Sequence, residues 1–157
     1  MANQALSVRA PTEDDVATLL TLRARFFEDQ FTKGQRERAE DHKEWLQDST
    51  AKLLKNKRAT LFLIESDQGP VGYGYGSTRV TPKMENPVVS SVEEFMIEQY
   101  ARGKAAGTLL FEAMRADFIS RGADRIQLRV LSQNEEGHGF WAALGFEPYL
   151  TTYELAG

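Results

Sequence analysis

A short turn rich in small residues has the composition of an anion-binding site: Arg102-Gly103-Lys104-Ala105-Ala106-Gly107. It follows a segment with strand character and precedes an apolar stripe with helical spacing. The first backbone N–H groups of a helix have no partner inside the helix, and the helix dipole adds partial positive charge there. Small side chains let a ligand approach that backbone, so the turn predicts a pyrophosphate site. The alternative, from the turn alone, is an ordinary strand-to-helix connection with charged surface residues.

Two other nucleotide-binding patterns are not met. No Gly-Lys-Ser/Thr stands where the phosphate loop of a nucleoside triphosphatase requires it. Gly72, Gly74 and Gly76 alternate inside a predicted strand and open no helix, so they are not a dinucleotide fingerprint. We interpret them as positions where large neighbours pack against the strand, or as the mark of a bulge.

The composition narrows the chemistry. The 157 residues include no cysteine and two histidines, which excludes thiolate chemistry and leaves no all-histidine metal cage. A net charge of −4 argues against general affinity for nucleic acid or anionic membranes. No apolar run resembles a signal peptide or spans a bilayer. We therefore expect one cytoplasmic domain over residues 1–157, with no metal, nucleic-acid or membrane partner.

The elements that must position the turn alternate between strands and helices, without a repeat or a linker. Strand patterns cover residues 6–9, 60–65, 71–78, 88–97 and 125–130, and one or two closing strands are expected after residue 145. Helical patterns begin at Thr12, cover about residues 36–55 and 105–119, and begin again at Asn134. The order predicts a mixed sheet with helices on both faces.

Two motifs in this order match one family. Residues 92–107 read VEEFMIEQYARGKAAG, a strand followed by an Arg-x-x-Ala-x-Gly turn and a helix. Downstream, Asn134, Phe140-Trp141 and Leu144-Gly145-Phe146 follow the strand at residues 126–130. This resembles the GNAT superfamily of N-acetyltransferases, which has a strand, Arg/Gln-x-x-Gly-x-Gly/Ala and a helix, and later Asn-x-x-Ala-x-x-Phe-Tyr and Leu-Gly-Phe. The resemblance covers residues 6–155.

The resemblance implies the α/β GNAT fold, with a mixed, mostly antiparallel sheet of six to seven strands and about four helices. It implies acetyl-CoA as cosubstrate and no metal. Backbone amides of residues 103–108 would hold the CoA pyrophosphate, and the strand edge at residues 95–97 would pair with the pantetheine arm. The implied cofactor-binding residues are Phe95, Met96, Ile97, Arg102, Gly103, Lys104, Ala105, Ala106, Gly107, Thr108, Asn134 and Trp141.

Two residues depart from the family pattern. Ala105 stands where glycine is usual. We expect a negative φ there, as at a helix start, so that alanine is sterically allowed and its methyl group only weakens phosphate binding. Trp141 replaces the tyrosine that in many relatives protonates the departing thiolate, and indole is no useful acid.

Acetyl transfer to an amine needs a proton acceptor, because an alkylammonium has a pKa of about 10. Glu93 and Glu94 are the candidates for this catalytic role. They are neighbours in a strand that the fold buries on both faces, so we expect their side chains on opposite sides. A structural role, pairing with Arg or Tyr, is the alternative for either. Glu93 resembles the acidic residue that polyamine acetyltransferases carry at this point.

The acceptor site is expected at the end of the first helix. Phe27, Glu28 and Tyr75 are the predicted substrate-binding residues. For Asp29, a solvated position at the helix end is at least as well supported as a role in the acceptor site. His138 shares a helical face with Asn134 and Trp141 and could shuttle protons, although a surface or packing role is favoured. His42 reads as a surface residue.

The leading hypothesis is transfer of an acetyl group from acetyl-CoA to a primary amine of a small cationic molecule. The resemblance implies direct attack through a tetrahedral intermediate. Two alternatives stay open at this point: a peptide or protein N-acetyltransferase, and a GNAT-shaped module that binds an acyl-CoA without turnover. Relatives often form dimers, through the last strands or the sheet edge, which makes a homodimer one expectation.

Overall fold

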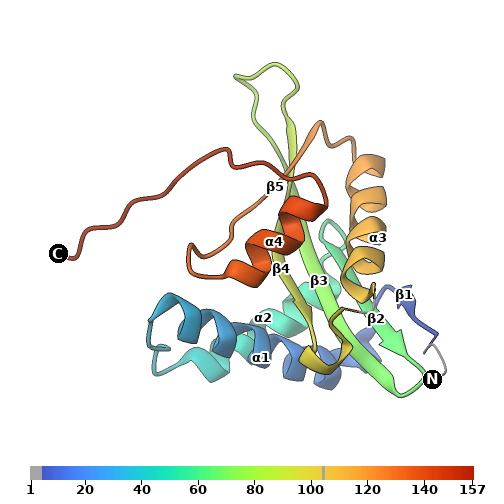
Figure 1. Ribbon diagram of the computed structural model, residues 1–157. Coiled ribbons are helices and arrows are strands. Elements are labelled where there is room, and N and C mark those ends of the chain that lie inside the picture. The colour runs from blue at the N-terminus through green and yellow to red at the C-terminus, as the bar shows by residue number, and fades with distance from the viewer. Residues whose placement is uncertain (1–4, 104) are drawn as a thin grey trace.

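The chain folds into five strands and four helices, as a computed structural model shows for residues 5–103 and 105–157 (Figure 1). The strands are β1 (Ser7–Arg9), β2 (Thr60–Ser66), β3 (Gly69–Val80), β4 (Val88–Ile97) and β5 (Arg125–Leu128). The helices are α1 (Val16–Gly34), α2 (His42–Lys55), α3 (Ala106–Ser120) and α4 (Glu135–Ala143), with short 3-10 turns at Glu13–Asp15 and Gln99–Ala101.

The strands form one sheet in the order of the sequence, β1-β2-β3-β4-β5. The first four are antiparallel neighbours, whereas β5 lies parallel to β4. A parallel neighbour needs a crossover connection, which α3 supplies. Residues 60–66 and 69–80 form the predicted hairpin. The mixed sheet with helices on both faces is therefore confirmed.

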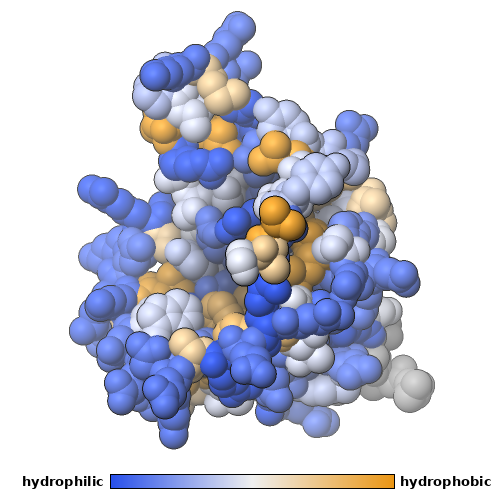
Figure 2. Space-filling view, turned by 90° about the vertical axis from the view of Figure 1, so that its left-hand side faces the viewer, coloured by the Kyte–Doolittle hydropathy of each residue, from blue (hydrophilic) through white to orange (hydrophobic). Residues whose placement is uncertain are grey.

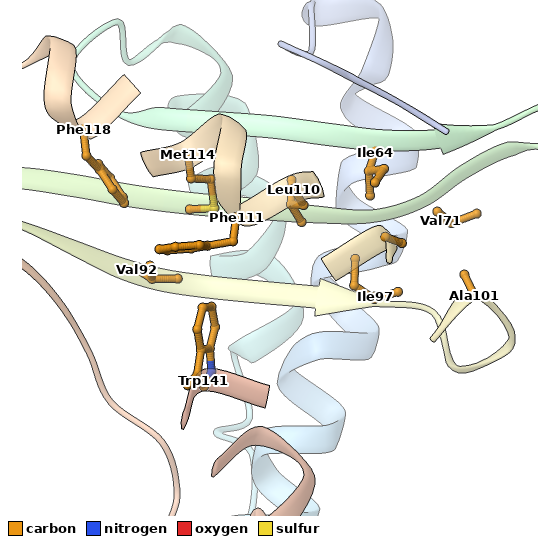
Figure 3. Packing of buried hydrophobic residues seen from close by; sticks show 11 residues of the cluster. Ile64, Val71, Val92, Ile97, Ala101, Leu110, Phe111, Met114, Phe118 and Trp141 are labelled. Carbon is orange, nitrogen blue, oxygen red and sulfur yellow. The ribbon is translucent and has the colours of Figure 1, made fainter. Parts of the chain in front are cut away.

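Each face of the sheet has its own apolar core. On one face α1 covers Leu63, Tyr73 and Met96. On the other, the buried side of α3 packs on β2, β3 and β4, as Figure 3 shows for Leu110, Phe111, Met114 and Phe118. These residues recur at the three- and four-residue intervals of one helical face. The helices are therefore fixed to the sheet by the periodicity that predicted them.

The alternating glycines of β3 make room for α3. A Cβ atom at Gly74 would overlap the Met114 sulfur, and one at Gly76 would overlap the Phe118 ring. Both interpretations made from sequence hold, because large neighbours do pack on these glycines and a bulge lies opposite Gly76. The glycines bring helix and strand close together.

Two sequence-based expectations are wrong, one on the number of strands and one on the backbone conformation at Ala105. The sheet has five strands rather than six to seven, because residues 146–157 form no strand. The backbone at Ala105 is left-handed, with φ +65°, so the expected negative φ is incorrect there. The helix proper begins one residue later, at Ala106. A non-glycine residue in this conformation is under strain, of about 1–2 kcal/mol.

Candidate functional site: a cleft beside the split between two strands

The two parallel strands separate halfway along β4. Their pairing runs from Val89–Arg125 to Val92–Leu128 and ends there, while β4 continues to Ile97. On its other side β4 stays paired with β3 as far as Ile97. Residues 93–97 therefore present one strand edge without a strand partner in the described chain. Such an edge accepts a further extended chain through backbone hydrogen bonds.

A cleft of about 200 Å³ lies along this edge. Its walls come from the end of β4, the turn before α3, the start of α4 and the second half of α1. The lining residues are Phe26, Asp29, Gln30, Lys33, Phe95, Met96, Ile97, Arg102, Gly103, Gly107, Asn134, Glu136, Gly137, Phe140 and Trp141. Eight of the twelve residues expected to bind CoA thus line one cleft: Phe95, Met96, Ile97, Arg102, Gly103, Gly107, Asn134 and Trp141.

The turn supplies free backbone at the mouth of the cleft. Gly103 has φ +76° and nothing within 4 Å of the position of a Cβ atom. The first hydrogen bond of α3 runs from Leu109 N–H to Ala105 O, 3.0 Å, so the amides of residues 106–108 precede the helical ladder. These amides can therefore donate to an anion. Lys104, which was expected to add charge, lies outside the described residues.

Arg102 braces the end of the strand. Its Nε donates to Ile97 O, 2.9 Å, and its Nη1 lies 3.1 Å from a Glu136 carboxylate oxygen at the start of α4. The guanidinium thus joins β4 to α4 across the cleft. It remains exposed enough to meet a phosphate, but it also has a structural partner on each side.

An aromatic cluster forms the apolar wall. Trp141 is buried and packs edge-on against Phe95, with ring centroids 4.8 Å apart. Phe140 lies 5.5 Å from Phe95 and covers Gly107, where a Cβ atom would sit 2.8 Å from its ring. Glycine at 107 is therefore required by packing between α3 and α4, in addition to any contact with ligand.

Asn134 begins α4 and connects it to α1. Its Oδ1 accepts from Gly137 N–H, 3.0 Å, which caps the helix, and from Lys33 Nζ, 3.3 Å. Lys33 also pairs with Asp29, 3.0 Å, one helical turn earlier. The Lys33 ammonium consequently reaches across the cleft from α1, a position that no sequence motif singled out.

The cleft face of α1 is rotated by one residue from the sequence expectation. Phe26, Asp29, Gln30 and Lys33 line the cleft, at spacings that place them on one helical face. Phe27 and Glu28 lie outside the lining. The spacing of Phe26 and Lys33, seven residues apart, was the available signal for this face.

Phe27 belongs to a separate aromatic cluster between α1 and α2. It packs against Phe31, His42 and Trp45, with centroids 5.3–6.5 Å away. His42 is half-buried and stacks on Trp45 at 5.6 Å, so the expectation of a plain surface histidine is incorrect.

The two glutamates lie on the same side of the sheet, contrary to the expectation from strand alternation. Tyr75 pairs with Glu94 and Gly76 with Val92, which leaves Glu93 as the extra residue of a β-bulge. Glu93 accepts from Ser77 Oγ, 2.8 Å, and Glu94 accepts from Tyr73 OH, 2.9 Å. Tyr73 and Ser77 are four residues apart on β3, so they share a face, and their glutamate partners share it too.

Burial separates the roles of these two carboxylates. Glu94 is 7% exposed and receives two hydrogen bonds from the Arg23 guanidinium, at 2.8 and 2.9 Å. Arg23 is 3% exposed and also donates to Thr50, 2.7 Å. Glu94 is therefore the buried counter-ion that fastens α1 and α2 to β4. Glu93 is exposed and accepts one hydrogen bond, so the rest of its carboxylate is accessible from solvent.

The tyrosines beside these carboxylates are held in the neutral form. Burial raises the pKa of Tyr73 well above 10, and the negative charge of Glu94 raises it further. Partial burial raises the pKa of Tyr75, with additional repulsion from Glu93 and Glu94. For Arg23, burial lowers the pKa, but the hydrogen bonds and charge of Glu94 outweigh this and leave the pKa raised. The network is therefore a permanent ion pair with a neutral phenol attached.

The position of the usual proton donor is occupied by Trp141, and His138 does not replace it. His138 is exposed, its Nε2 lies 3.1 Å from Leu131 O, and it is outside the cleft lining. Among the described residues, no cluster of three His, Asp or Glu side chains has metal-binding geometry. In the same part of the chain, no helix is long and apolar enough to cross a membrane.

The split strand pair, the helix-start turn and the apolar cleft are the features that the resemblance to an acyltransferase family predicts. A family model described as the acetyltransferase (GNAT) family matches residues 17–146. The chain belongs to the GNAT family of acetyltransferases.

Similar solved structures agree in fold at low sequence identity. An aminoglycoside N-acetyltransferase, AAC(6')-Iy in complex with CoA, aligns with a TM-score of 0.81 and 13% identity, over 99% of this chain and 97% of that one. A tetramutant of a Bacillus halodurans protein aligns with a TM-score of 0.83 and 19% identity, over 96% of this chain and 99% of that one. A ribosomal-protein-alanine N-acetyltransferase from Brucella melitensis aligns with a TM-score of 0.74 and 16% identity, over 98% of this chain and 100% of that one. A search of curated protein sequences gave no significant match.

Proposed function

We propose that this protein transfers the acetyl group of acetyl-CoA directly to a primary amine of a small cationic molecule. The single observation that carries the proposal is the open edge of β4 at residues 93–97, beside a cleft whose mouth is a helix-start turn. That edge suits an extended pantetheine arm, and the turn suits a pyrophosphate. Arg102 would bind the cofactor near its pyrophosphate, and Asn134 would bind the pantetheine arm.

Glu93 is the residue that we assign as proton acceptor. It precedes Phe95, which lines the cleft, by two residues, and two residues of strand span about 7 Å. Two or more water molecules in line would carry the proton from an attacking amine in the cleft to this carboxylate. The single neutral donor, Ser77, leaves the Glu93 carboxylate three further acceptor sites.

Lys33 is the residue that we assign to the leaving group. The departing thiolate gains negative charge, and a cation placed inside an apolar cleft stabilises such charge more strongly than it would in water. Lys33 is the cation of α1 in this cleft, and Trp141 on the opposite wall supplies no acidic proton. A thiolate that meets this ammonium can also receive its proton.

A cationic acceptor is supported by the exposed Glu93 and the neutral phenol of Tyr75 beside it. The negative charges of Glu94 and Asp29 are already paired, with Arg23 and Lys33, so the site offers one free carboxylate rather than a broad acidic pocket. The aminoglycoside acetyltransferase among the similar structures acts on a polycationic amine, which supports this class. The ribosomal-protein-alanine acetyltransferase supports the second candidate, a peptide amine.

Thermal denaturation with acetyl-CoA tests cofactor binding. Ligand at about a hundred times Kd adds about 2.7 kcal/mol, which corresponds to a rise in Tm of about 5–10 °C for a chain of this size. Thiol release is then followed with polyamines, aminoglycosides, amino acids and peptides. Turnover restricted to peptides would replace the small-amine proposal, and binding without turnover would refute catalysis. No Tm shift at millimolar acetyl-CoA would refute the site.

Replacing Lys33 by Met tests its role, with Lys43→Met on the exposed side of α2 as the matched control. We expect a loss of kcat of about tenfold to a hundredfold in the first variant, with little change in the second. The loss should shrink when the thioester is replaced by one with a more acidic thiol. An equal loss with both thioesters would contradict the assignment.

A further inference from the structure

The sheet face opposite α3 is covered by α1 over only part of its length. The core under α1 includes Tyr73 and Met96 but no residue of β3 beyond Tyr73. Figure 1 shows α1 and α2 at the end of the sheet away from the connection between β3 and β4. Figure 2 views the molecule from the side opposite α3, and hydrophilic groups predominate there. The rest of this face is therefore a polar surface rather than an extension of the core.

Two arginines lie on this polar part of the face. Ser77 and Arg79 continue the side of Tyr73 along β3, because residues two apart in a strand point the same way. Arg79 pairs with Val89 on β4, and Val89 pairs with Arg125 on β5. The two arginines therefore stand on either side of one residue of β4. Their Cα atoms are about 10 Å apart, the width of two strand spacings.

Neutral side chains hold Arg79 across β4. Its Nη1 donates to Ser91 Oγ, 2.7 Å, and its Nη2 donates to Gln127 Oε1, 3.2 Å. These bonds fix the direction of the guanidinium without neutralising its charge. The side chain is exposed, and no ion pair within the described residues involves it. A guanidinium that is fixed but not neutralised is prepared to bind an anion through two parallel hydrogen bonds.

Arg125 is a second cation without a carboxylate partner in the described part of the chain. Its Nη2 meets Asn86 O, 3.3 Å, and Met84 Sδ, 3.7 Å. Its Nε is buried and has no hydrogen-bond partner among the described residues. A buried donor without an acceptor is rare in folded proteins and indicates that a partner is missing. An anion placed between Arg79 and Arg125 supplies acceptor oxygens to both guanidinium groups.

The arginine pair adjoins the point at which β4 and β5 separate. Arg79 is bound to Ser91 and Gln127, which form the last pair but one before the strands part. Glu93 follows Ser91 by two residues, about 7 Å of strand, and lies on the same side of the sheet. Positive charge and negative charge therefore stand next to each other on one open surface that leads to the split.

We propose that Arg79 and Arg125 form a subsite for an anionic group of the acceptor, a carboxylate or a phosphate, while the reacting amine of the same molecule lies at the split. This proposal rests on the proposed acetyl transfer and narrows its acceptor to an amine that is cationic at one end and anionic at the other. The two ends are about 7–10 Å apart, by the strand spacing between Arg79 and Glu93. The opposite charges at these two positions turn the amine toward the thioester.

Paired acceptors test the subsite in the thiol-release assay. 4-Aminobutyrate and 6-aminohexanoate carry a carboxylate, and 4-aminobutanamide and 6-aminohexanamide have the same lengths without it. We expect the KM of at least one acid to be at least tenfold below that of its amide. Arg79→Gln and Arg125→Gln should each raise that KM about tenfold to a hundredfold and leave the KM of the amide within about twofold.

Arg115→Gln, at an exposed position of α3 on the other face of the sheet, is the matched control and should change neither KM. Equal KM values for acid and amide would overturn the subsite. So would a KM for the acid that rises as much in Arg115→Gln as in Arg79→Gln.

Binding in the absence of acetyl-CoA separates this inference from acetyl transfer. In nitrogen-15 spectra, 6-aminohexanoate should shift the Nε–H signals of Arg79 and Arg125 and the side-chain amide signal of Gln127, and 6-aminohexanamide should leave them in place. These shifts without thiol release from any amine would support the subsite and refute acetyl transfer. Thiol release without a shift at either arginine would overturn the subsite and leave acetyl transfer standing. An equal shift at Arg115 would show general attraction of anions to the surface and would also overturn it.

Discussion

The neighbouring glutamates of β4 are expected to respond in opposite ways when each is replaced by glutamine. Glu94 neutralises Arg23, which is 3% exposed, and Glu94→Gln leaves that guanidinium buried without a counter-ion. Removing one partner of a buried pair costs about 3–5 kcal/mol. For a chain of this size, that loss lowers Tm by about 6–20 °C. Turnover per folded molecule should stay within about fivefold, because Glu94 is buried and already accepts three hydrogen bonds, from Arg23 and Tyr73.

Glu93→Gln should do the reverse. The side chain is exposed and its hydrogen bond with Ser77 can be kept by the amide, so Tm should change by less than about 2 °C. Loss of a general base lowers kcat by about 10²–10⁴. The rate of this variant should recover in part at alkaline pH, where more of the amine is already neutral.

Circular dichroism melting and thiol release on the same preparations separate the two effects. The control Arg23→Met with Glu94→Leu removes both buried charges and should recover much of the lost stability, because paired apolar replacements are often neutral. The assignment is refuted if Glu94→Gln keeps its Tm but loses kcat by a hundredfold. It is equally refuted if Glu93→Gln retains kcat within threefold.

Three further outcomes follow from backbone and charge. Ala105→Gly should preserve the stability or raise it by up to about 1 kcal/mol, and should tighten CoA binding. Ala106→Gly, in the adjacent helix, should lower the stability by about the same amount. Denaturant melts in which the two variants lose equal stability would contradict this. Gly107→Ala should destabilise by about 1–3 kcal/mol through overlap with a ring of α4, whereas Gly139→Ala, with nothing within 4 Å, should be neutral or stabilising. The pKa of Asp15 is held well below its usual range, first by hydrogen bonds from an arginine and then by a backbone N–H. Because its pKa is lower in the folded than in the unfolded state, ionised Asp15 stabilises the fold above pH of about 4, and this stabilisation is lost as the pH falls further. The Tm of Asp15→Asn should therefore depend less on pH than the Tm of the wild type between pH 5 and pH 2. Parallel curves of Tm against pH would disprove the prediction.

Much of the fold could be predicted because its signals are local. The helical stripe from Leu110 to Phe118 and the alternating glycines of β3 are repeated patterns, and each pattern names the face that must be buried. The turn at residues 102–107 was recognisable for the same reason, because a helix start supplies its anion site from the backbone alone.

The predicted number of strands was too high because the last segment has the composition of a strand but pairs with no other strand. Residues 149–155 have strand composition, yet a strand exists only when another edge pairs with it. Among the described residues no strand pairs with this segment, and its large side chains are exposed. A sequence pattern describes what a segment can do, and not whether its partner lies in the same chain.

The face of α1 that enters the cleft could not be fixed from the sequence. Phe26 and Phe27 are both apolar, and Glu28 and Asp29 are both acidic, so composition does not distinguish a rotation of 100°. The buried Arg23–Glu94 pair sets that rotation, because it fixes one residue of α1 against β4 over 71 positions of sequence. Phe26, Asp29 and Lys33 then follow onto the cleft by helical geometry.

The sequence by itself determined the order of elements, the turn of small residues before α3, the pair of glutamates and the lack of cysteine, since each depends on residue type and short spacing. The tertiary structure alone decided which glutamate is buried, because the bulge at Glu93 overrides strand alternation and brings both carboxylates to one face. It also decided that Ala105 adopts a left-handed conformation, that Lys33 enters the cleft, and that residues 147–157 make no backbone hydrogen bond to the other described residues. These features arise from contacts between segments far apart in the sequence, where no local pattern records the outcome.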